Sequence, residues 1–132
     1  MIALIFALAV QSTPPPYLQF MEEGEALGRA SYLGGVCAGL GLVASEKDDL
    51  IGLLDDLERR AILAGTDGPV VSGAVSAGVD REKRAVDTML DLGPDDGSER
   101  RQRREAQTVE YLGKGCADLT INYPTVFTWT GG

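Results

Sequence analysis

The sequence predicts an all-α fold, a small antiparallel bundle of about four helices with one disulfide and a short extended C-terminal tail. Three observations support this prediction. Apolar residues recur three or four positions apart in successive segments, which is the spacing of one face of an α-helix. Short turns rich in glycine and proline separate these segments. The chain of 132 residues has two cysteines, which fall on the apolar faces of the first and last segments.

The N-terminal segment is strongly apolar. Met1–Val10 carries no charged side chain and is about half of the ~20 residues that a helix needs to cross a bilayer. Its length is typical of the apolar region of a signal peptide, and small residues follow where a peptidase cuts. We therefore expect a signal peptide over residues 1–12 and a proline-rich linker over 13–17, with no stable membrane anchor; a short element packed on the core is the alternative. The helical domain then spans residues 18–121, and the extended tail spans 122–132.

The first predicted helix begins between Leu18 and Glu25 and ends near Ala44. It contains many glycines, each of which costs ~0.5–1 kcal/mol relative to alanine in a helix interior, so its stability depends on tertiary packing. The glycine surface lets another helix approach closely. We expect that helix to belong to the same chain; a homo-oligomer formed through this first helix is the alternative. Its apolar face comprises Leu27, Ala30, Leu33, Cys37 and Leu40.

The second predicted helix begins at Ser45. Ser45 followed three residues later by Asp48 is typical of a helix N-cap and its N3 residue. Gly65 is expected to end the helix, and residues 66–69 form a turn. The apolar face comprises Leu50, Leu53, Leu54, Leu57, Ala61 and Ala64.

The third predicted helix spans about Pro69 to Leu92, and Gly93 follows it. Its first half, residues 69–79, is rich in valine and glycine, so a strand or a loop is the alternative there. Basic side chains are expected to point outward at Arg81, Lys83 and Arg84. The inward face comprises Val71, Val75, Val79, Val86, Met89 and Leu90.

The fourth predicted helix begins at Ser98 and ends at Asn122–Pro124. After it, the alternation in Thr125–Thr130 puts Phe127 and Trp129 on one side of a strand. A strand without a partner in a helical chain can add to another protein's sheet, so both rings are candidate partner-binding residues. The alternative is that they cover the bundle's own end. The helix carries Ala106, Val109, Leu112, Cys116 and Leu119 on its apolar face.

A disulfide is predicted between Cys37 and Cys116. A bundle that makes the first and last helices neighbours brings these sulfurs together. The bond would close a loop of about 80 residues, which the loop-entropy relation values at ~4–5 kcal/mol. Such a bond indicates an oxidising compartment, so we expect the protein to be periplasmic or secreted. In the cytoplasm, the alternative, these cysteines are two buried thiols.

A resemblance to a family rests on the surroundings of both cysteines. The run LGRASYLGGVCAGLG, Leu27 to Gly41, contains a Tyr-Leu-x-x-x-Cys core that ends at Cys37, and a second Tyr-Leu pair precedes Cys116. In these features the chain resembles a family of small exported bacterial helical proteins of unknown function. The resemblance implies export, helices and one disulfide, and it implies no catalytic residue. The plan is also similar to that of periplasmic acid-stress chaperones, without a residue-by-residue match.

The charge composition excludes several functions. Twenty acidic and 12 basic side chains give a net charge of −8, and the chain has no histidine. Histidine-dependent nucleophile pairs and imidazole metal sites are therefore excluded, and a general nucleic-acid binder would need a basic face. Residues 22–58 hold nine acidic and two basic side chains, so the acidity is concentrated there.

The remaining charged motifs do not predict catalysis. The pairs Asp48-Asp49 and Asp55-Asp56 lie on helices, where adjacent side chains point ~100° apart and do not converge on one metal ion. The turn at Asp95-Asp96 lacks the pattern of a calcium-binding loop. We expect no catalytic residue, no metal and no cofactor. The densest basic run is a candidate binding site for an acidic partner, with a solvated face as the alternative; it comprises Arg100, Arg101, Arg103 and Arg104.

Together these features predict a non-enzymatic exported domain that binds another cell-envelope protein as an accessory or inhibitor. The alternative is a periplasmic acid or stress chaperone. Protonation of the twenty carboxyl groups below about pH 4 would reverse the net charge and loosen the fold.

Overall fold

The computed structural model describes residues 16–131, and the all-α prediction is confirmed there. The predicted signal peptide over residues 1–12 and most of the predicted linker lie outside the described residues. The elements are α2 (Pro16–Gly39), β1 (Val43–Ser45), α3 (Lys47–Leu63), α4 (Gly68–Leu90), α5 (Glu99–Asn122) and β2 (Phe127–Trp129).

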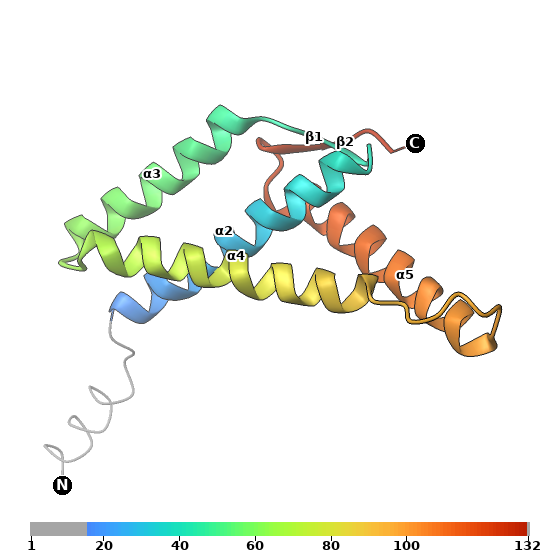
Figure 1. The fold of residues 1–132 in the computed structure, drawn as a ribbon. Helices are drawn as coiled ribbons and strands as arrows, with labels where there is room; N and C mark the ends of the chain where they lie inside the picture. The colour runs from blue at the N-terminus through green and yellow to red at the C-terminus, as the bar shows by residue number, and fades with distance from the viewer. Residues whose placement is uncertain (1–15, 132) are drawn as a thin grey trace, which may run out of the picture.

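The four described helices are arranged around α2. In the view of Figure 1, α3, α4 and α5 outline a triangle, and α2 crosses it from the lower left to the small sheet at the top. The most extensive helix contact is between α2 and α4. Helix α2 therefore forms the centre of the bundle, and the other helices lie against different parts of its surface.

Glycines bring α2 and α4 together. A Cβ atom at Gly28 would overlap the carbonyl oxygen of Val75, and one at Gly78 would overlap that of Glu25. No residue other than glycine fits at these two positions without moving a backbone. The prediction that a helix of the same chain covers the glycine surface is confirmed at Gly24 and Gly28.

The first helix ends earlier than predicted. It stops at Gly39, and Gly41 adopts a φ of +75°. The amide of Leu42 donates to the carbonyl of Cys37 at 3.0 Å and that of Gly41 to Ala38 at 3.0 Å, which together form a Schellman motif. This motif ends the helix and leads the chain into β1. The apolar spacing predicts a helix that continues to about Ala44.

The C-terminal strand has a partner within the chain. β2 pairs antiparallel with β1, in a register that sets Val43 opposite Trp129 and Ser45 opposite Phe127. The expectation of an unpartnered strand is therefore wrong. Ser45 belongs to β1, and α3 begins at Lys47 after Glu46, so the predicted Ser45 cap is also wrong. The pairing with β2 holds Ser45 extended and takes it out of the helix start.

Several other boundaries follow the predicted chemistry. Gly65 has a φ of +83° directly after the α3 cap, and the Ser98 hydroxyl accepts a hydrogen bond from the Arg101 amide at 3.2 Å. Residues 69–79 are helical, so the strand or loop alternative is wrong. Pro16 begins α2 and does not belong to the linker, because the first turn of a helix does not need its amide hydrogen.

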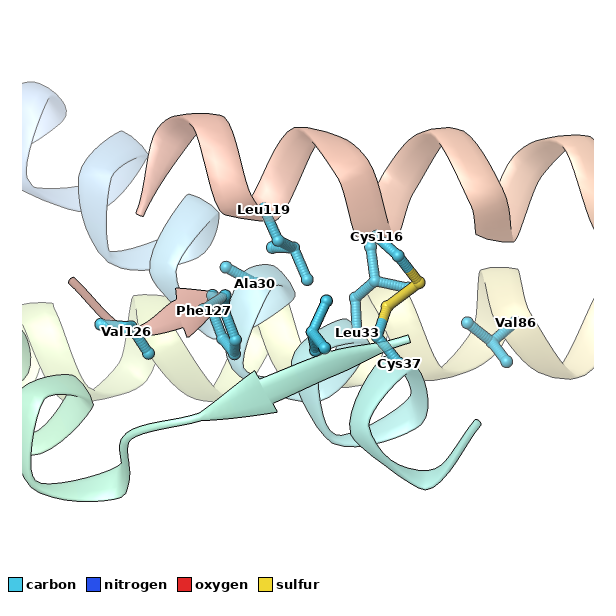
Figure 2. Close-up of a cluster of buried hydrophobic side chains, with 9 residues drawn as sticks. Ala30, Leu33, Cys37, Val86, Cys116, Leu119, Val126 and Phe127 are labelled. Atoms are coloured by element: carbon cyan, nitrogen blue, oxygen red, sulfur yellow. A yellow bond between two sulfur atoms is a disulfide. The ribbon is translucent and has the colours of Figure 1, made fainter. Parts of the chain in front are cut away.

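The core consists of two apolar clusters. Figure 2 shows the first, with the yellow bond of the predicted disulfide between Cys37 and Cys116, whose Cα atoms are 5.7 Å apart. Its buried members are Ala30, Leu33, Cys37, Val43, Val86, Cys116, Leu119, Val126 and Phe127. The second lies where the N-terminal half of α2 meets α3 and α4. Its buried members are Phe20, Leu27, Leu57, Ala61 and Val71.

Some residues predicted to face inward are exposed. Leu40, Ala64 and Leu90 lie at or just beyond the end of a helix. Ala106 and Val109 lie within α5. Val109 is 72% exposed because the neighbouring Thr108, which is 7% exposed, takes the buried position on that turn.

Candidate functional site

A groove of about 450 Å³ lies between α2 and α5. Its floor is apolar because the facing side chains of the two helices are small or aliphatic. Those side chains are Ala26, Ala30, Leu33 and Leu119. Polar side chains surround the floor, namely Arg29, Glu82, Tyr111, Lys114, Asp118, Asn122 and Tyr123.

A buried carboxylate lies at the centre of the polar wall. Glu82 of α4 is 3% exposed. Arg29 Nε donates to its Oε2 at 3.3 Å, and the Tyr111 hydroxyl donates to its Oε1 at 2.9 Å. A buried charge needs such partners, because water no longer solvates it. The three side chains thus fix one another beside the groove.

The close packing of α2 and α4 makes this network possible. Gly78 lies against the backbone of Glu25, and Glu82 follows one turn later on α4. On α2, Arg29 follows Glu25 by the same interval. Arg81 of α4 forms an ion pair with Glu25 of α2. Two ion pairs therefore join α2 and α4 close to the contact at Gly78.

Two tyrosines at the groove have altered acidity. Burial, followed by the hydrogen bond to Glu82, raises the pKa of Tyr111. Burial, followed by the nearby charge of Glu23, raises the pKa of Tyr123. Both hydroxyls are therefore protonated at neutral pH, and the Tyr111 hydroxyl is a hydrogen-bond donor to Glu82.

A second groove of about 220 Å³ adjoins the first at Ala26 and Tyr123. It lies between α2 and α3 and includes Leu53 in its lining. Arg60 Nη1 is 3.1 Å from Glu23 Oε2, a distance typical of an ion pair. The contact lacks the angle of a hydrogen bond, so this buried oxygen has no hydrogen-bond partner among residues 16–131. The two grooves form one path across α2.

The two candidate aromatic residues of the tail have different environments. Phe127 is 2% exposed, lies against Gly34, and makes an edge-on contact with Tyr123 at a ring distance of 6.4 Å. Its ring thus covers the bundle's own core, which was the alternative prediction, and is not accessible to a partner. Trp129 is 42% exposed and stays a candidate partner-binding residue.

Three arginines of the candidate run line one pocket of about 230 Å³ at the start of α5, namely Arg100, Arg101 and Arg104, whereas Arg103 does not line it. Arg101 donates from Nε to Glu105 at 2.9 Å and from Nη1 to the Gly93 carbonyl at 2.6 Å. The hydrogen bond with Glu105 raises the pKa of Arg101 further. Arg100 and Arg103 are exposed, and Arg104 is half-buried near Gly93. Binding of an acidic partner by this run stays a prediction.

The sequence did not identify Arg29, Glu82 and Tyr111 as site residues. One pattern indicates Glu82 in retrospect. It lies four residues before buried Val86 and four after buried Gly78, so a carboxylate interrupts the buried face of α4. An acidic residue in phase with a buried face requires a partner, although the spacing does not say which one.

Comparison of the chain with protein-family models, curated proteins and solved structures finds no match. The resemblance to small exported helical proteins therefore stays a prediction, as does the chaperone alternative. Over residues 16–131 there is no group of three or more carboxylates or cysteines arranged to hold a metal ion. None of the helices in that range is both long and apolar enough to cross a membrane.

Proposed function

We propose that the chain is a non-enzymatic binding domain of the cell envelope, which holds a segment of another protein in the groove between α2 and α5. The observation that carries this proposal is the fixed arrangement of Arg29 and Tyr111, held by buried Glu82, beside an apolar floor. Binding sites commonly combine an apolar surface with a few converging polar groups.

The rigidity of the site supports binding of a flexible segment. Arg29 and Tyr111 are already held in place by Glu82, so less conformational entropy is lost when a partner contacts them. The volume of about 450 Å³ is within the ~300–1,000 Å³ usual for binding pockets, and the adjoining groove extends the path.

The disulfide supports the envelope location. Cys37 and Cys116 are both 0% exposed, so the bond is a structural link inside the core. Structural disulfides persist in oxidising compartments and are rare in the cytoplasm. Export by the predicted signal peptide over residues 1–12 is part of this proposal.

Blocking the groove tests the function. Ala26 is exposed and lines both grooves, so Ala26→Trp fills their junction without entering the core. Ala38→Trp is the matched control, because Ala38 is exposed on the same helix and lines neither groove. Each protein would be used to isolate partners from the envelope of the organism that makes it.

We expect the control to retain the wild-type partner and Ala26→Trp to lose at least nine-tenths of it. Equal recovery with both variants would contradict the proposed site. Recovery of no specific partner by the wild-type protein would contradict the proposed function.

A further inference from the structure

The groove contains a guanidinium group with unused donors. Arg29 hydrogen-bonds to Glu82 through Nε, and its side chain is 47% exposed. Among residues 16–131, neither Nη group of Arg29 pairs with a carboxylate, and the Tyr111 hydroxyl is the other polar group close to the guanidinium. Because Glu82 orients the group through Nε, the two Nη groups form a fork beside the groove. Such a fork matches the two oxygens of a carboxylate.

The surrounding charges favour a single negative charge on the ligand. Lys114 of α5 lines the same groove, is exposed, and forms no ion pair within the described part of the chain. The carboxylates of Glu82 and Asp118 also line it. The two positive and two negative side chains sum to zero, so the groove as a whole does not concentrate negative charge. A singly charged carboxylate placed against Arg29 and Lys114 loses less solvation than a doubly charged phosphate.

The shape of the groove favours the end of a chain. On one side it continues past Ala26 and Tyr123 into the second groove. At the other end, the hydrogen bonds from Arg29 and Tyr111 to Glu82 join α2, α5 and α4. The end of a ligand that lies along the path therefore meets these polar groups beside Arg29.

We propose that the groove binds the C-terminal end of a polypeptide. The terminal carboxylate pairs with Arg29 and Lys114, and the last apolar side chain lies on Leu33 and Leu119. Preceding residues pass Tyr123, where the Asn122 side chain and the tyrosine hydroxyl offer hydrogen bonds to their backbone. These hydrogen-bonding groups beside the apolar floor favour a peptide, because an alkyl chain has no backbone to pair with them. The inference rests on the proposed function and specifies its ligand.

Peptides with and without a free carboxylate test the inference. The probes are N-acetylated tetrapeptides that end in valine, leucine or phenylalanine, each prepared as the free acid and as the C-terminal amide. They are titrated into the ¹⁵N-labelled, disulfide-bonded full chain and followed by NMR. Dodecanoate serves as a lipid-like carboxylate of similar charge.

We expect at least one free acid to shift the amide signals of Arg29, Gly115 and Leu119, and its amide form to bind at least tenfold more weakly. Lys114→Gln is expected to weaken the acid about fivefold, whereas Lys83→Gln, an exposed position on α4 outside both grooves, leaves it unchanged. Arg29→Lys keeps the charge beside Glu82 but lacks the fork, and is expected to weaken binding similarly.

Three results would overturn the inference. One is equal binding of acid and amide, the second is no binding of any peptide at millimolar concentration, and the third is tighter binding of dodecanoate than of every peptide at the same residues. If Ala26→Trp nevertheless loses the envelope partner, the proposed function stands and only the terminal carboxylate is wrong. If Ala26→Trp keeps the partner, the groove itself is wrong.

Discussion

Helix α2 meets α4 and α5 through two different kinds of interface. Against α4, the backbones approach so closely that Gly28 and Gly78 admit no side chain. Against α5, a groove of about 450 Å³ separates part of the two helices, and one disulfide joins them. The first interface has no room for a ligand, whereas the second leaves one face of α2 accessible.

This difference shows how a small domain can stay folded and still keep an open site. A covalent link restricts the unfolded chain and does not require continuous packing between the helices that it joins. The close α2–α4 interface, in turn, carries Glu82 to a position where it holds Arg29 and Tyr111 beside the groove. One interface therefore positions the polar groups of the site, and the other preserves its space.

The largest effect is expected at the disulfide. Replacing both Cys37 and Cys116 with alanine removes the link across a sequence separation of 79 residues. We expect the free energy of unfolding to fall by about 3–5 kcal/mol, measured by urea denaturation at pH 7. A change below about 1 kcal/mol would show that packing alone attaches α5 to α2.

A smaller effect is expected at the α2–α4 interface. Gly28→Ala puts a methyl group against the Val75 carbonyl and forces the helices apart, so we expect a loss of about 2–3 kcal/mol. Gly35→Ala is the matched control on the same helix, because a Cβ there meets nothing within 4 Å. The control should gain about 0.5–1 kcal/mol, since alanine favours the helix. Equal effects of both variants in thermal denaturation would show that the close approach is unimportant.

The smallest effect is expected at the hydrogen-bonded side chains of Arg29, Glu82 and Tyr111, which lie between the two interfaces. Tyr111→Phe removes one donor from buried Glu82, and we expect a loss of about 1–2 kcal/mol at pH 7. Raising the pH ionises the unfolded tyrosine before the folded one, because the pKa of Tyr111 is raised in the folded protein. Its stabilising contribution is therefore complete below about pH 10 and is lost as the pH rises through the folded pKa.

Measuring the free energy of unfolding of the wild type and of Tyr111→Phe from pH 8 to 11 checks the direction of this pH dependence. Wild-type stability should decrease more steeply above about pH 10 than that of the variant. The stability of the variant should still decrease somewhat over this range, because the pKa of Tyr123 is also raised in the folded protein. An identical pH dependence of the two proteins would contradict the role of the Tyr111 hydroxyl.

The sequence predicts some of these features better than others, for physical reasons. Helical spacing placed both cysteines on buried faces, because the period of a helix is local and a disulfide needs only that these faces meet. The pairing of Ser45 with Phe127 was missed because three-residue strands carry little pattern and their partners are distant in the chain. Glu82 was missed because its partners, Arg29 and Tyr111, come from two other helices.

The central claim is that the face of α2 left open by α5 is where a partner protein binds. Site-specific photo-crosslinking in the living cell tests it most directly, with p-benzoylphenylalanine in place of Asp118, which is exposed and lines the groove. The same group in place of Glu110, exposed on the same helix outside both grooves, is the control. Our account predicts a specific crosslinked partner from position 118 and none from position 110. A partner crosslinked only from position 110, or equally from both, would contradict it.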